Sequence, residues 1–126
     1  MTATAAQINL IRKLQADNAY IATLTVDWDA EHRSEANGYA FARQNLSIQS
    51  AEDAAWLTSS APKREDYSDI TEFRAANRAN AERWADRRIA ARQAGRSEYV
   101  AALTADPETL TKEQASSMID LLKGNR

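Results

Sequence analysis

The sequence contains no cysteine and a single histidine, His32. The missing cysteines exclude disulfide bonds, thiolate metal sites and cysteine nucleophiles, and one histidine excludes any site that needs two imidazole ligands. Glycine occurs only three times, too rarely for a glycine-rich phosphate loop, and the patterns G-x-x-x-x-G-K, G-x-S-x-G and H-E-x-x-H are missing. We therefore expect a protein that is not an enzyme and that uses no metal, cofactor or small-molecule substrate.

Long apolar runs and a strong net charge are also missing. No run approaches the roughly 18 apolar residues that a membrane span needs, and no charged-then-apolar leader opens the chain. Sixteen basic residues against eighteen acidic ones give a net charge of -2, so the whole chain is neither a basic nucleic-acid coat nor an acidic tail. These observations predict a cytoplasmic protein with no membrane partner.

Large aliphatic residues are scarce, and alanine takes their place. Leu, Ile, Val and Phe together number 20, whereas alanine alone numbers 26. Alanine has the highest helix propensity but buries little apolar area. The composition predicts closely packed helices around a thin core, which in a small domain often needs support from a partner or a second copy.

Both ends of the chain predict capped amphipathic helices. Thr4 with Gln7 forms a capping box, and Thr111 with Gln114 forms a second one. After the second box, apolar residues recur at the i, i+3, i+4, i+7 spacing of a helix face. The members of this face are Ala115, Met118, Ile119 and Leu122. We expect the two terminal helices to pack against each other.

The first half of the middle region predicts shorter helices. For residues 27–44 we prefer a single helix, although Asn37-Gly38 also permits two short helices that meet there. Ser47 and Ser50 offer N-caps for the helix that follows.

The longest helix is expected over about residues 70–94, with Gly95 as its C-terminal stop. A short helix over 97–103 follows it. Residues 59–67, Ser-Ser-Ala-Pro-Lys-Arg-Glu-Asp-Tyr, are a possible internal linker ahead of the long helix.

The predicted fold is all-α: a single helical domain over residues 1–126, built as a bundle of four to six helices around one long central helix. No stretch alternates with period two for long enough to propose a strand. The predicted core consists of Ile8, Ile11, Leu14, Ile21, Trp28, Phe41, Trp56, Phe73, Trp84, Leu103, Met118, Ile119 and Leu122.

The two terminal segments, Gln-Ile-Asn-Leu-Ile-Arg-Lys-Leu from residue 7 and Leu-Thr-Lys-Glu-Gln-Ala-Ser-Ser-Met-Ile-Asp-Leu-Leu from residue 110, together form a two-part pattern. It resembles a short helical motif of uncharacterised small proteins of actinobacteria and their phages. In those proteins a couple of dozen residues separate the parts, whereas far more lie between them here. The resemblance implies a phage or phage-derived accessory protein acting in the host cytoplasm, and twelve arginines against four lysines fit a GC-rich genome. It implies no activity.

Arginine dominates the predicted long helix. Residues 70–96 hold seven arginines and three acidic residues. At about 100° per residue, five of the arginines share one face of the helix. This arginine stripe is the candidate interaction surface, and its members are Arg74, Arg78, Arg88, Arg92 and Arg96. Arg83 and Arg87 fall on the opposite side.

Three interpretations of the stripe are open. It pairs within the fold with the acidic segment 17–35, which holds five acidic residues and one arginine; it follows a nucleic-acid backbone; or it docks an acidic protein surface.

Acidic residues cluster with the histidine around Trp28. The cluster consists of Asp27, Asp29, Glu31, His32 and Glu35. A helical two-metal site needs a second histidine, so we interpret the cluster as an acidic face near a helix N-terminus, where the helix dipole favours negative charge.

The function that these features favour is non-enzymatic: a protein-interaction factor that binds a protein partner, or itself, through an exposed helix face. The first alternative is a small nucleic-acid-binding protein that uses the arginine stripe. A further alternative is a structural or assembly component that acts as an oligomer.

Overall fold

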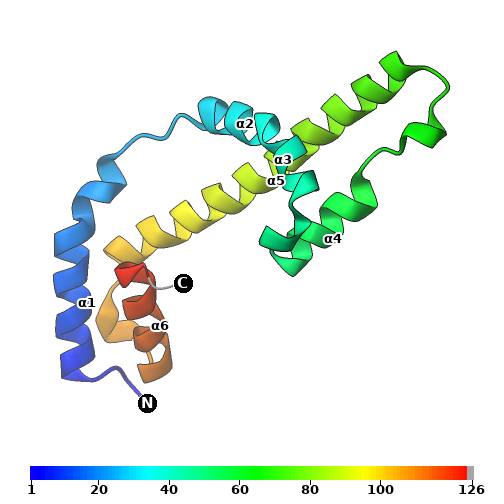
Figure 1. The fold of residues 1–126 in the computed structure, drawn as a ribbon. Helices are drawn as coiled ribbons and strands as arrows, with labels where there is room; N and C mark the ends of the chain where they lie inside the picture. Colours follow the sequence, from blue (N-terminus) through cyan, green and yellow to red (C-terminus); the bar gives the residue numbers. More distant parts are fainter. Residues whose placement is uncertain (125–126) are drawn as a thin grey trace. The chain divides into compact units, whose positions relative to one another are not determined.

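The all-α prediction is confirmed by the computed structural model, which describes residues 1–124 (Figure 1). Within this range six α-helices are joined by short 3₁₀ turns, and the one pairing of extended backbone is an isolated bridge between Thr2 and Thr111. The α-helices are α1 (Ala5–Asn18), α2 (Trp28–Asn37), α3 (Tyr39–Gln44), α4 (Ala51–Ser60), α5 (Ile70–Thr104) and α6 (Lys112–Lys123). The 3₁₀ turns are η1 (Ala19–Thr23), η2 (Leu46–Ile48), η3 (Arg64–Asp66) and η4 (Pro107–Thr109).

Both predicted capping boxes are present. In each, the threonine hydroxyl accepts a hydrogen bond from the glutamine N–H at 3.1 Å, and the glutamine Oε1 accepts one from the threonine N–H at 2.9 Å. Ser50 caps α4 by accepting the N–H of Asp53. Local sequence signals therefore set these three helix starts.

Two predicted boundaries are wrong, and both involve a glycine. The preferred helix over 27–44 breaks at Gly38, whose ψ of -4° departs from helical geometry, so the two-helix alternative is the observed one. Gly95 does not stop the long helix, and the predicted helix 97–103 forms its last turns. Beyond Gly95, Ala102 and Leu103 are buried, and this packing outweighs the cost of about 1 kcal/mol for a glycine inside a helix.

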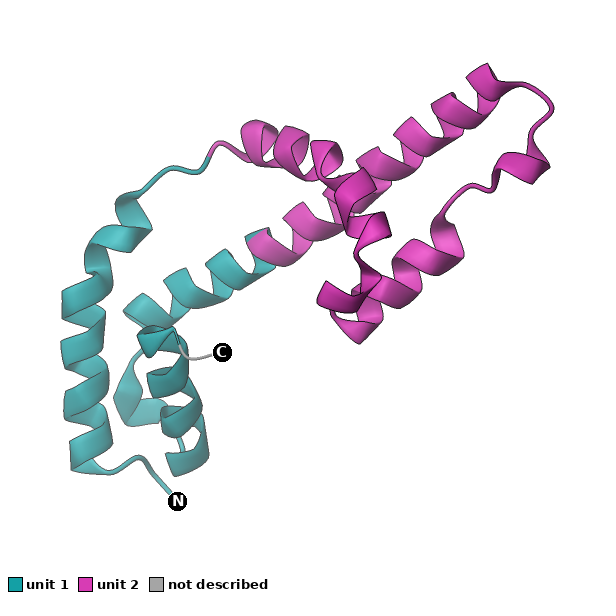
Figure 2. Cartoon of the chain, in the orientation of Figure 1, with its two compact units in different colours: residues 1–26, 93–126 teal, residues 27–92 magenta. Residues whose placement is uncertain are grey.

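The described chain divides into two compact units (Figure 2). Unit 1 consists of residues 1–26 and 93–124, and unit 2 consists of Asp27–Arg92. Helix α5 contributes to both units. The linker candidate 59–67 lies inside unit 2, where it connects the end of α4 to the start of α5.

In unit 1 the terminal helices pack against each other, as predicted. Their core consists of Ile11 from α1, Ala102 and Leu103 from α5, and Ala115 and Leu122 from α6. The Gln7 side chain, besides closing its capping box, donates to the Lys112 carbonyl and to the Ser116 hydroxyl, both at 3.2 Å.

The C-terminal end of α5 is held by Gln15 of α1. Its amide nitrogen donates to the carbonyls of Ala102 and Ala105 at 2.9 and 2.8 Å. The last carbonyls of a helix have no partner within the helix, so this side chain satisfies one of them, at Ala102, together with the carbonyl of Ala105 just after the helix, and ties α1 to the end of α5.

Unit 2 has its own core around Trp84 of α5. Trp84 is buried with Tyr39, Ala42 and Leu57, and the ring of half-buried Trp56 lies 5.7 Å from it, centroid to centroid. Tilted aromatic pairs at this separation are favourable. Helices α3 and α4 therefore pack against the middle of α5.

Most predicted core residues are buried or half-buried, but Phe41 is 61% exposed and its assignment is wrong. At about 100° per residue, Phe41 lies about 200° from Tyr39 around α3, so the burial of Tyr39 and Ala42 turns Phe41 outward. Four predicted members are buried: Ile11, Trp84, Leu103 and Leu122. The half-buried members are Ile8, Leu14, Ile21, Trp28, Trp56, Phe73, Met118 and Ile119.

Asn80 of α5 is completely buried in unit 2, and all its polar atoms are engaged. Its amide nitrogen donates to the Tyr39 and Ser60 hydroxyls, and its Oδ1 accepts from Arg83. The three partners come from α3, α4 and α5, so one polar side chain fixes the positions of three helices relative to one another.

Replacing Asn80 by alanine should lower the free energy of unfolding by about 1–3 kcal/mol, because the buried Tyr39 hydroxyl then loses its partner. Chemical denaturation of the full chain measures the change. The matched control is Asn9→Ala, at an exposed position of α1, which should change stability by less than about 0.5 kcal/mol. Equal effects of the two changes would contradict a structural role for the Asn80 network.

Candidate interaction surfaces

Two members of the arginine stripe, Arg88 and Arg92, are paired with carboxylates of unit 2. Arg88 lies 3.1 Å from Asp53 and 3.6 Å from Glu35, measured from guanidinium nitrogen to carboxylate oxygen. Arg92 lies 3.3 Å from Glu31 and also pairs with Glu35. The expected pairing between the stripe and the acidic segment 17–35 is therefore present through Glu31 and Glu35.

Arg87, which falls outside the predicted stripe, joins the same network. It pairs with Glu52 and Asp53 at 3.2 and 3.3 Å, and its guanidinium carbon lies 5.8 Å from the centroid of Trp56. Sequence reasoning missed these two acidic residues of α4, which precede their arginine partners by more than thirty positions. The available signal was their place in the first turn after the Ser50 cap, where acidic residues are favoured.

The other stripe members have different environments. Arg96, in unit 1, donates to the backbone carbonyls of Ile21 and Leu24 at the end of η1. Arg74 and Arg78 are exposed and make no hydrogen bond, ion pair or ring contact with any residue in the described range. Three of the five arginines are thus engaged within their own unit.

The acidic cluster around Trp28 is divided among separate contacts. Asp27 caps α2 by accepting the Ala30 N–H at 3.1 Å, and Glu31 and Glu35 pair with arginines. His32 Nε2 lies 2.8 Å from Asp86 and 3.4 Å from Glu82 on α5. In residues 1–124 no group of three or more His, Cys, Asp or Glu side chains could hold a metal ion.

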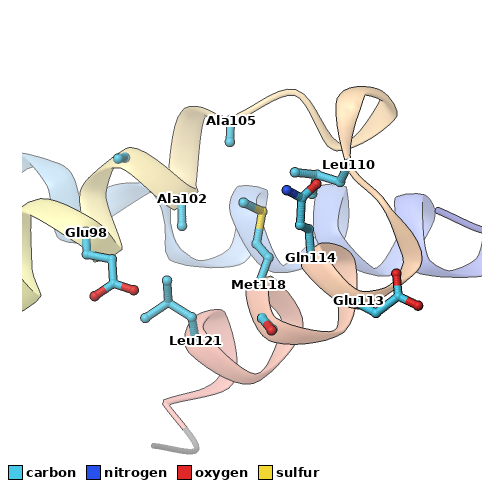
Figure 3. Close-up of a pocket in the computed structure, with 10 residues that line it drawn as sticks. Glu98, Ala102, Ala105, Leu110, Glu113, Gln114, Met118 and Leu121 are labelled. Atoms are coloured by element: carbon cyan, nitrogen blue, oxygen red, sulfur yellow. The ribbon is translucent and has the colours of Figure 1, made fainter. Parts of the chain in front are cut away.

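A groove of about 520 Å³ lies in unit 1 between the last turns of α5 and helix α6 (Figure 3). Small α5 side chains and larger ones from the α6 region form its apolar lining: Ala101, Ala102, Ala105, Leu110, Met118 and Leu121. Figure 3 shows Met118 and Leu121 projecting from α6 toward α5, with Glu98 and Glu113 at opposite ends of the groove.

The groove results from the alanine-rich composition. Ala101 and Ala105 are too short to fill the space beside α6, whereas the neighbouring Ala102 is buried in the core. Much of the opposite wall comes from the C-terminal part of the two-part motif, including Leu110, Met118 and Leu121. The motif therefore builds both a core face and an open apolar surface, which sequence patterning alone did not separate.

No family model matches the chain, and neither the curated proteins nor the solved structures contain a significant match to it. Within the described residues, no helix is both long and apolar enough to cross a bilayer.

Charge reversal should distinguish the paired arginines of the stripe, Arg88 and Arg92, from the unpaired Arg74 and Arg78 by their effects on stability. Replacing both Arg88 and Arg92 by glutamate places new negative charges beside Glu35 and Asp53, whose side chains are only 17% exposed. We expect the free energy of unfolding to fall by about 2–4 kcal/mol, less than for a fully buried pair because the arginines are partly solvated. Denaturation curves at low and high salt provide the measurement.

The matched control reverses Arg74 and Arg78, on the same helix but without partners in the described chain. Its stability should change by less than about 0.5 kcal/mol. If both double variants were equally stable, the network around Asp53 and Glu35 would not hold unit 2 together.

Proposed function

We propose that the protein is a non-enzymatic interaction factor that docks a protein partner through the groove between α5 and α6. The observation that carries this proposal is the open apolar lining of the groove in a chain with few large apolar residues. Exposed apolar concavities of this kind are typical of binding sites. The resemblance of the terminal segments supports a phage or phage-derived accessory role in an actinobacterial host.

The groove fits an amphipathic helix of the partner. Alanines on the α5 side allow close approach of a backbone, and Met118 on the α6 side has a flexible side chain that adapts to different apolar surfaces. Glu113 at one end is exposed and forms no ion pair within the described chain. The partner helix should therefore combine bulky apolar residues with a lysine or arginine near Glu113.

The alternative, nucleic-acid binding, is supported by Arg74 and Arg78, the exposed members of the stripe. It has less support than protein docking, because Arg88, Arg92 and Arg96 are engaged elsewhere. Phosphate contacts from several cations are needed for appreciable affinity at physiological salt.

A bulky charged side chain in the groove should abolish docking. Ala101 is exposed and lines the groove, so Ala101→Arg fills it without disturbing the core. Ala16→Arg is the matched control at an exposed α1 position that does not line the groove. Tagged protein is used for affinity capture from an actinobacterial lysate with and without nuclease. A stoichiometric protein that survives nuclease should be captured by the wild type and Ala16→Arg but not by Ala101→Arg.

Three outcomes would contradict the proposal. Capture that disappears with nuclease indicates nucleic-acid binding instead. Equal capture by Ala101→Arg places the docking surface outside the groove. If no protein is captured and the purified protein has an oligomeric mass in solution, the structural or assembly function is favoured.

A further inference from the structure

The cations of unit 2 fall into two sets. Arg87, Arg88 and Arg92 are paired with carboxylates. Arg43 of α3 and Lys63, which follows α4, have no carboxylate within the 4.0 Å of an ion pair anywhere in residues 1–124. Other cations of unit 2, such as Arg74 and Arg78, also have no carboxylate partner, but Arg43 and Lys63 line one hollow together. Both charges can therefore act on one bound anion.

Arg43 is held in place without being neutralised. Its Nη1 donates to Asn77 Oδ1 at 2.8 Å, and its guanidinium carbon lies 5.5 Å from the centroid of the Tyr39 ring. A guanidinium carries five N–H donors, so most of them stay available after these contacts. Because its position is already fixed, little side-chain entropy is lost when a ligand binds.

Two hollows adjoin Arg43. One, of about 250 Å³, is lined by Arg43, Lys63 and apolar residues that include Leu46, Leu57 and Pro62. The other, of about 330 Å³, is lined by Arg43 with Ala40, Gln44 and Asn77. Neither lining contains a carboxylate. The first hollow thus combines an apolar floor with two unneutralised cations.

An exposed apolar side chain lies beside these cations. Leu46 lines the first hollow with Arg43 and Lys63 and is 37% exposed. Exposed apolar side chains next to charged ones are typical of the centre and rim of a protein–protein contact.

We propose that this face of unit 2 binds an acidic protein segment that carries bulky apolar residues. The α3–η2 face, as we name it, consists of Arg43, Leu46, Pro62 and Lys63, which line the first hollow. An apolar side chain of the segment fills the hollow above Leu46, and its carboxylates pair with Arg43 and Lys63. The proposal does not depend on the groove of unit 1, which uses different residues.

A protein segment fits this face better than a nucleic acid. The lining of the first hollow includes the aliphatic Leu46 and Pro62, which complement aliphatic or aromatic protein side chains. Glu65 and Asp66 follow Lys63 closely in the chain, where they oppose the approach of a continuous row of phosphates. A few separate carboxylates meet less repulsion.

A displayed library of random short peptides tests the proposal with the full-length protein as bait. Selected peptides should be enriched in Asp and Glu together with Leu, Ile or Phe. Their affinity, measured by fluorescence anisotropy, should fall as salt rises, because charge pairing at an exposed surface is screened.

Lys63→Glu and Leu46→Ser both change exposed side chains that line the first hollow, so neither should disturb the fold. Each should weaken the selected peptides roughly tenfold or more. Arg33→Glu is the charge control: Arg33 is an exposed cation of α2 that lines neither hollow. Ile70→Ser is the apolar control, at a position that is 42% exposed. Both controls, and Ala101→Arg in unit 1, should bind the peptides like the wild type.

Several results would overturn the proposal. They are a selection without enriched sequences, an enrichment in basic peptides, and peptide binding that survives Lys63→Glu and Leu46→Ser. A fluorescent single-stranded DNA that binds more tightly than the selected peptides, and that loses affinity in Lys63→Glu, would assign the face to nucleic acid instead.

Discussion

The structure of unit 2 depends on two half-buried carboxylates, Glu35 and Asp53. Asp53 forms ion pairs with Arg87 and Arg88, and Glu35 forms ion pairs with Arg88 and Arg92. Two acidic residues therefore hold α2 and α4 to α5. Isolated ion pairs at a surface contribute little. Here several charges form one network on partly desolvated side chains, two of them beside tryptophan rings. In a unit with few large aliphatic residues, directional contacts of this kind specify helix positions that apolar packing would leave less defined.

This structural use of arginine changes the meaning of the charge on α5. As a sequence, the stripe has the appearance of a surface for a polyanion, because five cations share one helix face. In the structure Arg88 and Arg92 are neutralised by Glu31, Glu35 and Asp53, and Arg96 satisfies backbone carbonyls. The cations that no carboxylate neutralises therefore include Arg74 and Arg78 in the first half of α5, and Arg43 and Lys63, which line one hollow together.

Local signals predicted local structure well, and long-range contacts decided the rest. The capping boxes at Thr4 and Thr111 and the apolar face of α6 are short-range patterns, and the structure contains them. Gly38 and Gly95 are similar as sequence signals, yet only Gly38 interrupts its helix. Burial of the residues that follow does not separate them, because Tyr39 and Ala42 are buried beyond Gly38 just as Ala102 and Leu103 are beyond Gly95. The pairing of Asp53 with Arg88 depends on long-range contacts that no local pattern contains.

Alanine links the stability of the fold to its open surfaces. Ala85 and Ala102 are buried, and their small side chains allow other helices of the chain to approach α5 closely. Ala101 and Ala105 instead leave a groove that the chain itself does not fill. A helix of a binding partner in that groove would supply apolar area that the alanine-rich composition of this chain does not provide to its own core. Since a ligand that binds only the folded state stabilises it by mass action, binding at the groove and folding of unit 1 are thermodynamically linked. The thin core and the open groove then have one common cause, the replacement of large aliphatic residues by alanine.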